Sequence, residues 1–187
     1  EMLRSLVGSE MCIRDSNTLY ALVLSGSDKT ESAFVKFSGI LRYMYSQSGS
    51  ELIPAARELE YIRQYVELQK LRLNEHTHVE LEVEVTDGQV LVPSMLLITF
   101  IENAFKYGTS SEVDCTVRIC VRVDDHHLLF ETGNMVMRFR EDGLRGIGIE
   151  NCRKRLELLY PGRYELKAGA ENGIYRVNLD IRLKNED

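Results

Sequence analysis

Residues 93–108, PSMLLITFIENAFKYG, carry polar side chains at the spacing of one helix face, three or four positions apart. These side chains are Thr99, Glu102, Asn103 and Lys106. An amide oxygen can bind Mg²⁺, an ammonium can meet a phosphate, and a carboxylate can accept a proton or orient water. Mg-ATP would suit this set of groups. The solvated face of an ordinary amphipathic helix shows the same pattern, so the helix alone does not identify a site.

A second stretch, GLRGIGIEN at 143–151, places glycines directly before a helix. Glycine lets the backbone approach phosphate oxygens, and a helix N-terminus presents free amides and a positive dipole. The stretch is not a Walker A loop, which needs GK[ST], and it is not a Rossmann fingerprint. Glycines also close ordinary loops, so this stretch gains weight only together with the helix at 93–108.

Composition limits the classes of function. The chain has 187 residues, of which 44% are hydrophobic and 28% charged, and this balance is ordinary for a globular protein. The net charge of -6 argues against nucleic acid as a direct partner, because neutralising phosphates needs clustered Lys and Arg. The cysteines Cys12, Cys115, Cys120 and Cys152 show no C-x-x-C spacing, so neither a zinc site nor a disulfide framework is indicated.

The elements that must position these groups follow from hydrophobic periodicity. Strict alternation predicts strands at 79–85 and 113–123, a further strand at 128–132, and a hairpin of 164–168 with 175–183 that turns at Glu171-Asn172-Gly173. Pro93 is expected to begin the polar-faced helix and Gly108 to end it, with a second helix at 149–160. Residues 134–147 are expected to be irregular. Helices and strands that mix without a regular βαβ alternation predict an α+β fold with helices on one face of a sheet.

Two amphipathic helices precede the sheet. One begins near Asp28 and the other near Pro54, and the SQSGS stretch at 46–50 separates them. They predict an antiparallel helical hairpin whose apolar stripes need a partner. That partner is either the same chain or a second copy that completes a four-helix bundle.

The order of these motifs resembles the GHKL ATPase domain, and more narrowly the LytS-type sensor histidine kinases. The segments that carry the resemblance are ENAFKYG at 102–108, GIGIEN at 146–151 and RLELLYPGRYEL at 155–166. It runs from Asn17 to about Leu183. It implies a two-layer α/β sandwich of the GHKL (Bergerat) type over 78–187. The helical region at 17–75 would serve dimerisation and would carry the phosphoacceptor, although incompletely.

The resemblance also implies roles for individual residues. Asn103 would bind the Mg²⁺ that bridges the ATP phosphates, and Glu102 would orient or deprotonate the attacking nucleophile. Lys106 would contact phosphate. Gly146 and Gly148 would let backbone amides of the ATP lid reach the phosphates. The implied cofactors are therefore ATP and Mg.

Three further positions fall in or near the family's motifs. Asn151 is expected to belong to the same lid hinge. Tyr107 stands where the family usually shows His, on the phosphate side. Asn134 occupies the place of an Asp that reads the adenine amino group, and an Asn oxygen can still accept that hydrogen bond, without the charge.

The front of the chain departs from the family. NTLYAL at 17–22 matches the end of the phosphoacceptor helix, and counting back from Asn17 puts Glu10 where the histidine is expected. Either residues 1–16 are foreign to the gene, or this kinase has diverged and lost its acceptor. The abrupt end of the similarity favours the first account. The chain as written is not expected to phosphorylate itself.

The expected function is that of a histidine kinase fragment from a two-component system, which transfers phosphoryl from ATP to histidine and then to a response regulator. By resemblance, that regulator carries a LytTR-type domain and the kinase is a homodimer. The chain opens at Glu1, so we expect the cytoplasmic portion of an inner- or plasma-membrane protein whose anchor lies in a missing N-terminal region. The alternative is a non-catalytic nucleotide-binding or dimerisation module. A GHKL serine kinase is disfavoured by the helical pair.

Overall fold

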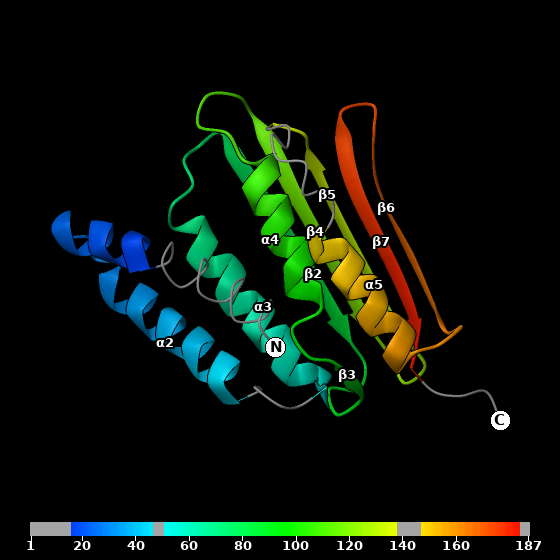
Figure 1. Ribbon diagram of the computed structural model, residues 1–187. Helices are drawn as coiled ribbons and strands as arrows, with labels where there is room; N and C mark the ends of the chain where they lie inside the picture. The colour runs from blue at the N-terminus through cyan, green and yellow to red at the C-terminus, as the bar shows by residue number, and fades with distance from the viewer. Residues whose placement is uncertain (1–15, 47–50, 138–146, 184–187) are drawn as a thin grey trace. The chain divides into compact units, whose positions relative to one another are not determined.

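The computed structural model describes residues 16–46, 51–137 and 147–183 (Figure 1). The chain divides into two compact units. The first comprises Glu1–Ser50 and Glu60–Arg72, and the second comprises Glu51–Leu59 and Leu73–Asp187. Among the described residues, no helix combines the length and the apolar character needed to cross a membrane.

The first unit is helical. Residues 16–24 form a helix, and α2 spans Thr30–Ser46. Helix α3 spans Ala55–Lys70, and its residues from 60 onward belong to this unit. The rings of Tyr43 and Tyr61 stack with centroids 4.3 Å apart, and one turn earlier in α2 Gly39 lies against Gln64. From Tyr43 back to Gly39 along α2, the contacted residue of α3 moves forward from Tyr61 to Gln64. The two helices are therefore antiparallel, and the predicted hairpin is confirmed.

The second unit contains a five-stranded sheet in the order β2-β4-β5-β7-β6. Its strands are β2 Thr77–Val85, β4 Cys115–Val123, β5 His127–Met135, β6 Tyr164–Glu171 and β7 Ile174–Arg182. β2 pairs with β4 in parallel, and all the other pairs are antiparallel. Helices α4, Leu97–Gly108, and α5, Ile147–Leu159, lie on the same face of the sheet (Figure 1). The predicted two-layer α/β sandwich is confirmed.

The core of this unit follows from strand alternation. Alternate side chains of the central strands are at most 3% exposed and face the helices: Val117, Ile119, Val121, Leu128, Phe130, Val177, Leu179 and Ile181. Burying each such side chain contributes about 1.5–3 kcal/mol. The opposite face is charged, with Arg118 2.6 Å from Glu80 and Arg122 3.0 Å from Glu84. The glutamates of the edge strand β2 discourage pairing with another chain.

The turn between β6 and β7 agrees with the sequence prediction. Asn172 and Gly173 have φ angles of 52° and 77°, which fit the left-handed conformation of both central residues in a type I′ turn. This turn twists with the strands it joins, so the last hairpin of the sheet is specified locally.

The predicted start of the polar-faced helix is wrong. Pro93 does not begin α4 but ends β3, Leu91–Pro93, which pairs with β1, Leu52–Pro54, in a separate two-stranded ribbon. Met95 then takes a φ of 53°, a left-handed conformation that an α-helix cannot continue through. The helix therefore begins at Leu97.

The irregular segment expected from residue 134 also begins too early. Strand β5 continues to Met135, because Asn134 pairs with Val117 of β4 on one side and with Tyr175 of β7 on the other. The remainder of that segment up to residue 146 lies outside the described residues, apart from Val136 and Met137.

Candidate functional site

Helix α4 separates its apolar and polar residues as the spacing predicts. The side chains that are at most 2% exposed include Leu97, Ile101, Ala104 and Phe105. The half-buried or exposed side chains are Thr99, Glu102, Asn103, Lys106 and Tyr107. The Lys106 ammonium lies 5.6 Å from the centroid of the Tyr107 ring. The helix thus presents a carboxylate, an amide and an ammonium along one flank while its other side packs on the sheet.

The C-terminal end of α4 touches the sheet at Asn134. A Cβ on Gly108 would lie 2.7 Å from both Cγ and Nδ2 of Asn134, so only glycine allows this approach. Asn134 is 3% exposed, and its Nδ2 donates to the Met135 carbonyl at 2.8 Å. The Met137 amide donates to the Tyr107 carbonyl at 2.9 Å, which joins this end of the helix to the chain after β5.

The other end of α4 is bordered by α5. A Cβ on Gly148 would lie 3.2 Å from the Thr99 methyl group, and Cys152 Sγ lies 4.0 Å from the Leu96 carbonyl oxygen. Burial raises the pKa of the Cys152 thiol to about 11, while a hydrogen bond with Thr99 and the charge of Arg155 act weakly in the opposite direction. Cys152 is therefore a neutral packing residue, and Asn151 lies half-buried beside it in sequence.

The predicted site residues are thus distributed along α4. Glu102, Asn103, Lys106 and Tyr107 belong to the helix itself. Asn134 lies at its C-terminal end, and Gly148 lies against Thr99 near its N-terminal end. Thr99 and Gly108 are nine positions apart, which corresponds to about 13 Å along the helix axis. Gly146 lies outside the described residues.

Sequence reasoning missed a contact made by Arg155 of α5. Its guanidinium donates to both the carbonyl and the hydroxyl oxygen of Ser94 and to the Glu51 carbonyl. The only signal available in the sequence was spacing, because Arg155 follows Gly148 by seven positions and Cys152 by three, which places them on one helix stripe. The partner atoms are mostly backbone carbonyls, which no sequence pattern reveals.

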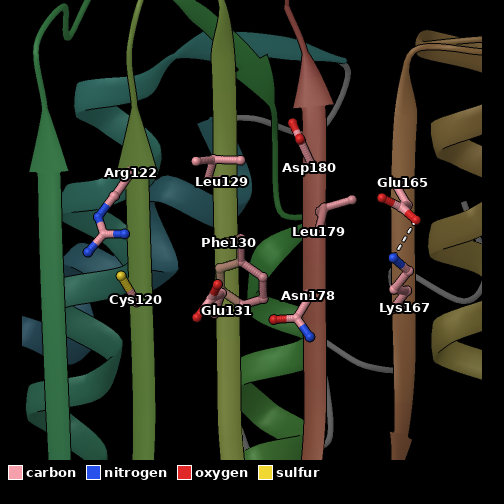
Figure 2. A pocket seen from close by; sticks show the side chains of 10 residues that line it. All are labelled: Cys120, Arg122, Leu129, Phe130, Glu131, Glu165, Lys167, Asn178, Leu179 and Asp180. Carbon is pink, nitrogen blue, oxygen red and sulfur yellow. Dashed lines mark ion pairs between the residues drawn. The ribbon is translucent and has the colours of Figure 1, made fainter.

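A shallow groove of about 290 Å³ lies on the opposite, helix-free face of the sheet (Figure 2). Its lining includes Cys120 and Arg122 of β4, Glu131 of β5, Asp180 of β7, and Glu165 and Lys167 of β6. Glu165 and Lys167 pair with each other at 2.6 Å. None of the predicted site residues lines the groove. Its mixed, internally paired charges are those of a solvated sheet face.

Comparison with known sequences identifies relatives. The family model described as "Histidine kinase" matches residues 16–77. The sensor histidine kinase BtsS of Escherichia coli K12 is 24% identical over 189 residues, covering 100% of this chain and 34% of the relative. The sensor protein LytS of Bacillus subtilis is 24% identical over 94% of this chain and 28% of its own length. LytS of Staphylococcus aureus Mu50, a sensor histidine kinase/phosphatase, is 25% identical over 97% and 29%.

Comparison with solved structures supports the fold. The histidine kinase domain of the Erythrobacter litoralis EL346 blue-light activated kinase matches with a TM-score of 0.54 at 16% identity, covering 94% of this chain and 96% of that one. A bacterial phosphotransferase matches with a TM-score of 0.50 at 11% identity, covering 90% and 89%. The chain spans about a third of the length of the curated relatives it matches, at 34% and 28% for the first two above.

Proposed function

We propose, from the premise that this chain is a homologue of the LytS-type sensor histidine kinases, that it binds Mg-ATP along α4 for phosphoryl transfer to histidine. The observation that carries the proposal is the polar flank of α4. It presents Asn103 with Glu102 and Lys106, and Asn134 and Gly148 lie at its two ends.

The donor set fits the ligand. Oxygen atoms of Asn103 and Glu102 are of the kind that Mg²⁺ prefers, and Mg²⁺ keeps several waters and substrate phosphates as its other ligands. Bound Mg²⁺ would neutralise charge on the phosphates. Lys106 would add a positive charge toward the phosphates, and Tyr107 would lie on the same side. Gly148 and Asn151 would border the phosphates from α5, together with Gly146.

Asn134 would hold the base. Its Nδ2 donates a hydrogen bond to the Met135 carbonyl at 2.8 Å, and this orientation would leave Oδ1 to accept a hydrogen bond from the adenine amino group. In the transfer, an imidazole nitrogen forms a bond to the γ-phosphorus as the bond from that phosphorus to the ADP oxygen breaks. The Glu102 carboxylate would take the imidazole proton.

The partners proposed for the whole protein follow from its relatives. A two-component kinase passes its phosphoryl group to an aspartate of a response regulator, and for this chain we propose a regulator of the LytTR type. The helical hairpin of the first unit would pair with a second copy. A membrane anchor would belong to parts of the protein beyond this chain.

A second candidate is a non-catalytic nucleotide-binding or dimerisation module. Glu10 stands where the acceptor histidine is expected, which favours this candidate for the chain as written. Residue 10 lies outside the described residues. The two candidates share the nucleotide site and differ in whether phosphate leaves ATP.

Calorimetric titration of Mg-ATP into the chain tests the shared site. We expect binding that weakens at least tenfold in Asn103→Ala, because a metal ligand is lost. Asn178→Ala is the matched control, since Asn178 is exposed on the opposite face of the sheet, and it should bind like the unmodified chain. If the folded chain fails to bind Mg-ATP, the site assignment is wrong.

Incubation with γ-labelled ATP separates the two candidates. Acid-labile phosphate on the chain, or on a second copy that supplies a complete phosphoacceptor helix, would show that the ATP-binding part is catalytic. Binding without transfer to either would favour the non-catalytic module.

A further inference from the structure

One stripe of α5 runs along the segment that leads into α4. Gly148 lies against Thr99, Cys152 lies against Leu96, and Arg155 binds Ser94. Going from Gly148 to Arg155 along α5, the contacted residues run backward from Thr99 to Ser94, so the two segments are antiparallel. The end of the stripe near the proposed phosphate site is thus rigidly connected, through two turns of helix, to Arg155.

Arg155 binds two backbone carbonyls and one hydroxyl group. One terminal nitrogen donates to the Ser94 carbonyl, and the other donates to Ser94 Oγ at 3.1 Å and to the Glu51 carbonyl at 3.2 Å. Ser94 is fully buried. A guanidinium presents its donors in a fixed plane, so binding three acceptors at once fixes the position of the side chain as well as its charge.

The residues that Arg155 binds flank the two-stranded ribbon of β1 and β3. The Ser94 amide donates to the Glu51 carbonyl at 3.0 Å, and Ile53 pairs with Val92. Arg155 therefore connects the two strands at the end of the ribbon, since Glu51 directly precedes β1 and Ser94 directly follows β3.

The same ribbon holds the start of α3. The amides of Ala55 and Ala56 donate to the carbonyls of Val90 and Gly88 at 2.8 and 2.9 Å. These are orphan donors of a first helical turn, and here the loop before β3 satisfies them. The Met95 amide donates to Glu58 Oε2 at 3.0 Å, and the Glu58 side chain is 1% exposed. The first turn of α3 is thus bound on two sides by the segment that precedes α4.

We propose that Arg155 is a positioning residue that couples nucleotide binding at α4 and α5 to the start of α3. The proposal rests on the proposed function, because it needs a nucleotide beside Gly148. A shift of α5 that adjusts Gly148 to the phosphates moves Arg155, and Arg155 carries the ribbon and the first turn of α3 with it. Coupling of this kind is reciprocal, so fixing α3 also favours the nucleotide-bound position of α5.

Hydrogen–deuterium exchange in the presence and absence of Mg-ATP tests the coupling on the full chain. The amides to follow are those of Ser94, Met95, Ala55 and Ala56. In the unmodified chain, we expect Mg-ATP to slow exchange at these amides. In Arg155→Gln, we expect that protection to disappear and the Mg-ATP affinity to fall about tenfold, within the usual range of coupling between sites. Arg155→Lys should restore part of both effects, because an ammonium can still reach one carbonyl.

Arg153→Gln is the matched control, since it makes the same change on an exposed position of the same helix. It should keep the protection at Ser94. A purely structural role would lower the stability of Arg155→Gln while leaving the nucleotide-induced protection in place, and that result overturns the proposal. If Arg155→Gln does not fold, Arg155→Lys serves in its place, because an ammonium reaches one carbonyl where the guanidinium bound three acceptors, and undiminished protection in that variant overturns the proposal equally. Failure of the unmodified chain to bind Mg-ATP would instead refute the proposed function.

Discussion

The pKa of the Cys152 thiol reflects the burial of this side chain. Its pKa of about 11 lies above the ordinary value of 9.0 because the thiol is buried, and burial disfavours the thiolate. The folded state therefore gains stability from this neutral thiol below pH 9, and it loses that stability as the pH rises toward 11 and beyond.

We expect the free energy of unfolding to fall by about 1 kcal/mol more in the unmodified chain than in Cys152→Ala between pH 8 and pH 10. Urea unfolding at the two pH values measures this difference. Cys152→Ala also costs a constant amount for the lost packing, so only the change with pH is informative. Parallel pH dependence in the two proteins would mean that the thiol is accessible to water.

Asn134 marks the limit of prediction at this scale. The resemblance to the GHKL family implied a role with the base, yet the stretch GNMVM at 133–137 gave no sign of a strand. Pairing with Val117 and Tyr175, both distant in sequence, extends β5 through it. Tertiary pairing thus overrode weak local signals.

The contact between α4 and β5 explains one glycine in terms of packing. Gly108 was expected to end the helix, and it is the last residue of α4, although it is not among the residues with positive φ. Its role is to admit the side chain of Asn134.

Gly108→Ala should therefore destabilise the chain by about 1–3 kcal/mol, the range for overpacking a close contact, and should also weaken Mg-ATP binding by displacing Asn134. Denaturant unfolding and calorimetry measure the two effects. Gly133→Ala is the control, because a Cβ there meets nothing within 4 Å. Equal stability of the two variants would show that α4 and β5 separate easily.

Among the elements, periodicity predicted those with several turns or alternations. The alternating sequence of β4 and the Asn172–Gly173 turn of the last hairpin were both predicted correctly. The three-residue strands β1 and β3 were missed, since such short segments carry no measurable period. Their pairing is what displaced the predicted start of α4.

At the scale of the molecule, the ribbon suggests where an independent fragment should begin. A boundary at residue 78 remains the prediction from sequence, but residues 51–59 cluster with the second unit. A fragment of 78–187 would lack β1, the buried Ile53, and the helix turn that binds Val90 and Gly88.

We expect the fragment 51–187 to unfold cooperatively in urea at a clearly higher midpoint than 78–187, because the shorter one leaves Val92 and the Met95 amide uncovered. Circular dichroism follows both transitions. A fragment of 73–187 serves as control. It lacks residues 51–59 and also residues 60–72, which the longer fragment shares with the whole chain, and it should resemble 78–187. Coincident transitions for all three would refute the role given to the ribbon.

The strand order also determines how long the sheet stays incomplete while the chain is being synthesised. β5 is central, but its neighbour β7 ends only at Arg182, 47 positions after Met135. At about 5–20 residues per second, a ribosome needs roughly 2 to 10 s to supply those residues. During that interval the hairpin of β4 and β5 has an open edge where β7 will pair, although α4 is already available to cover part of its apolar face. The nascent chain should therefore depend on chaperones until its last hairpin emerges.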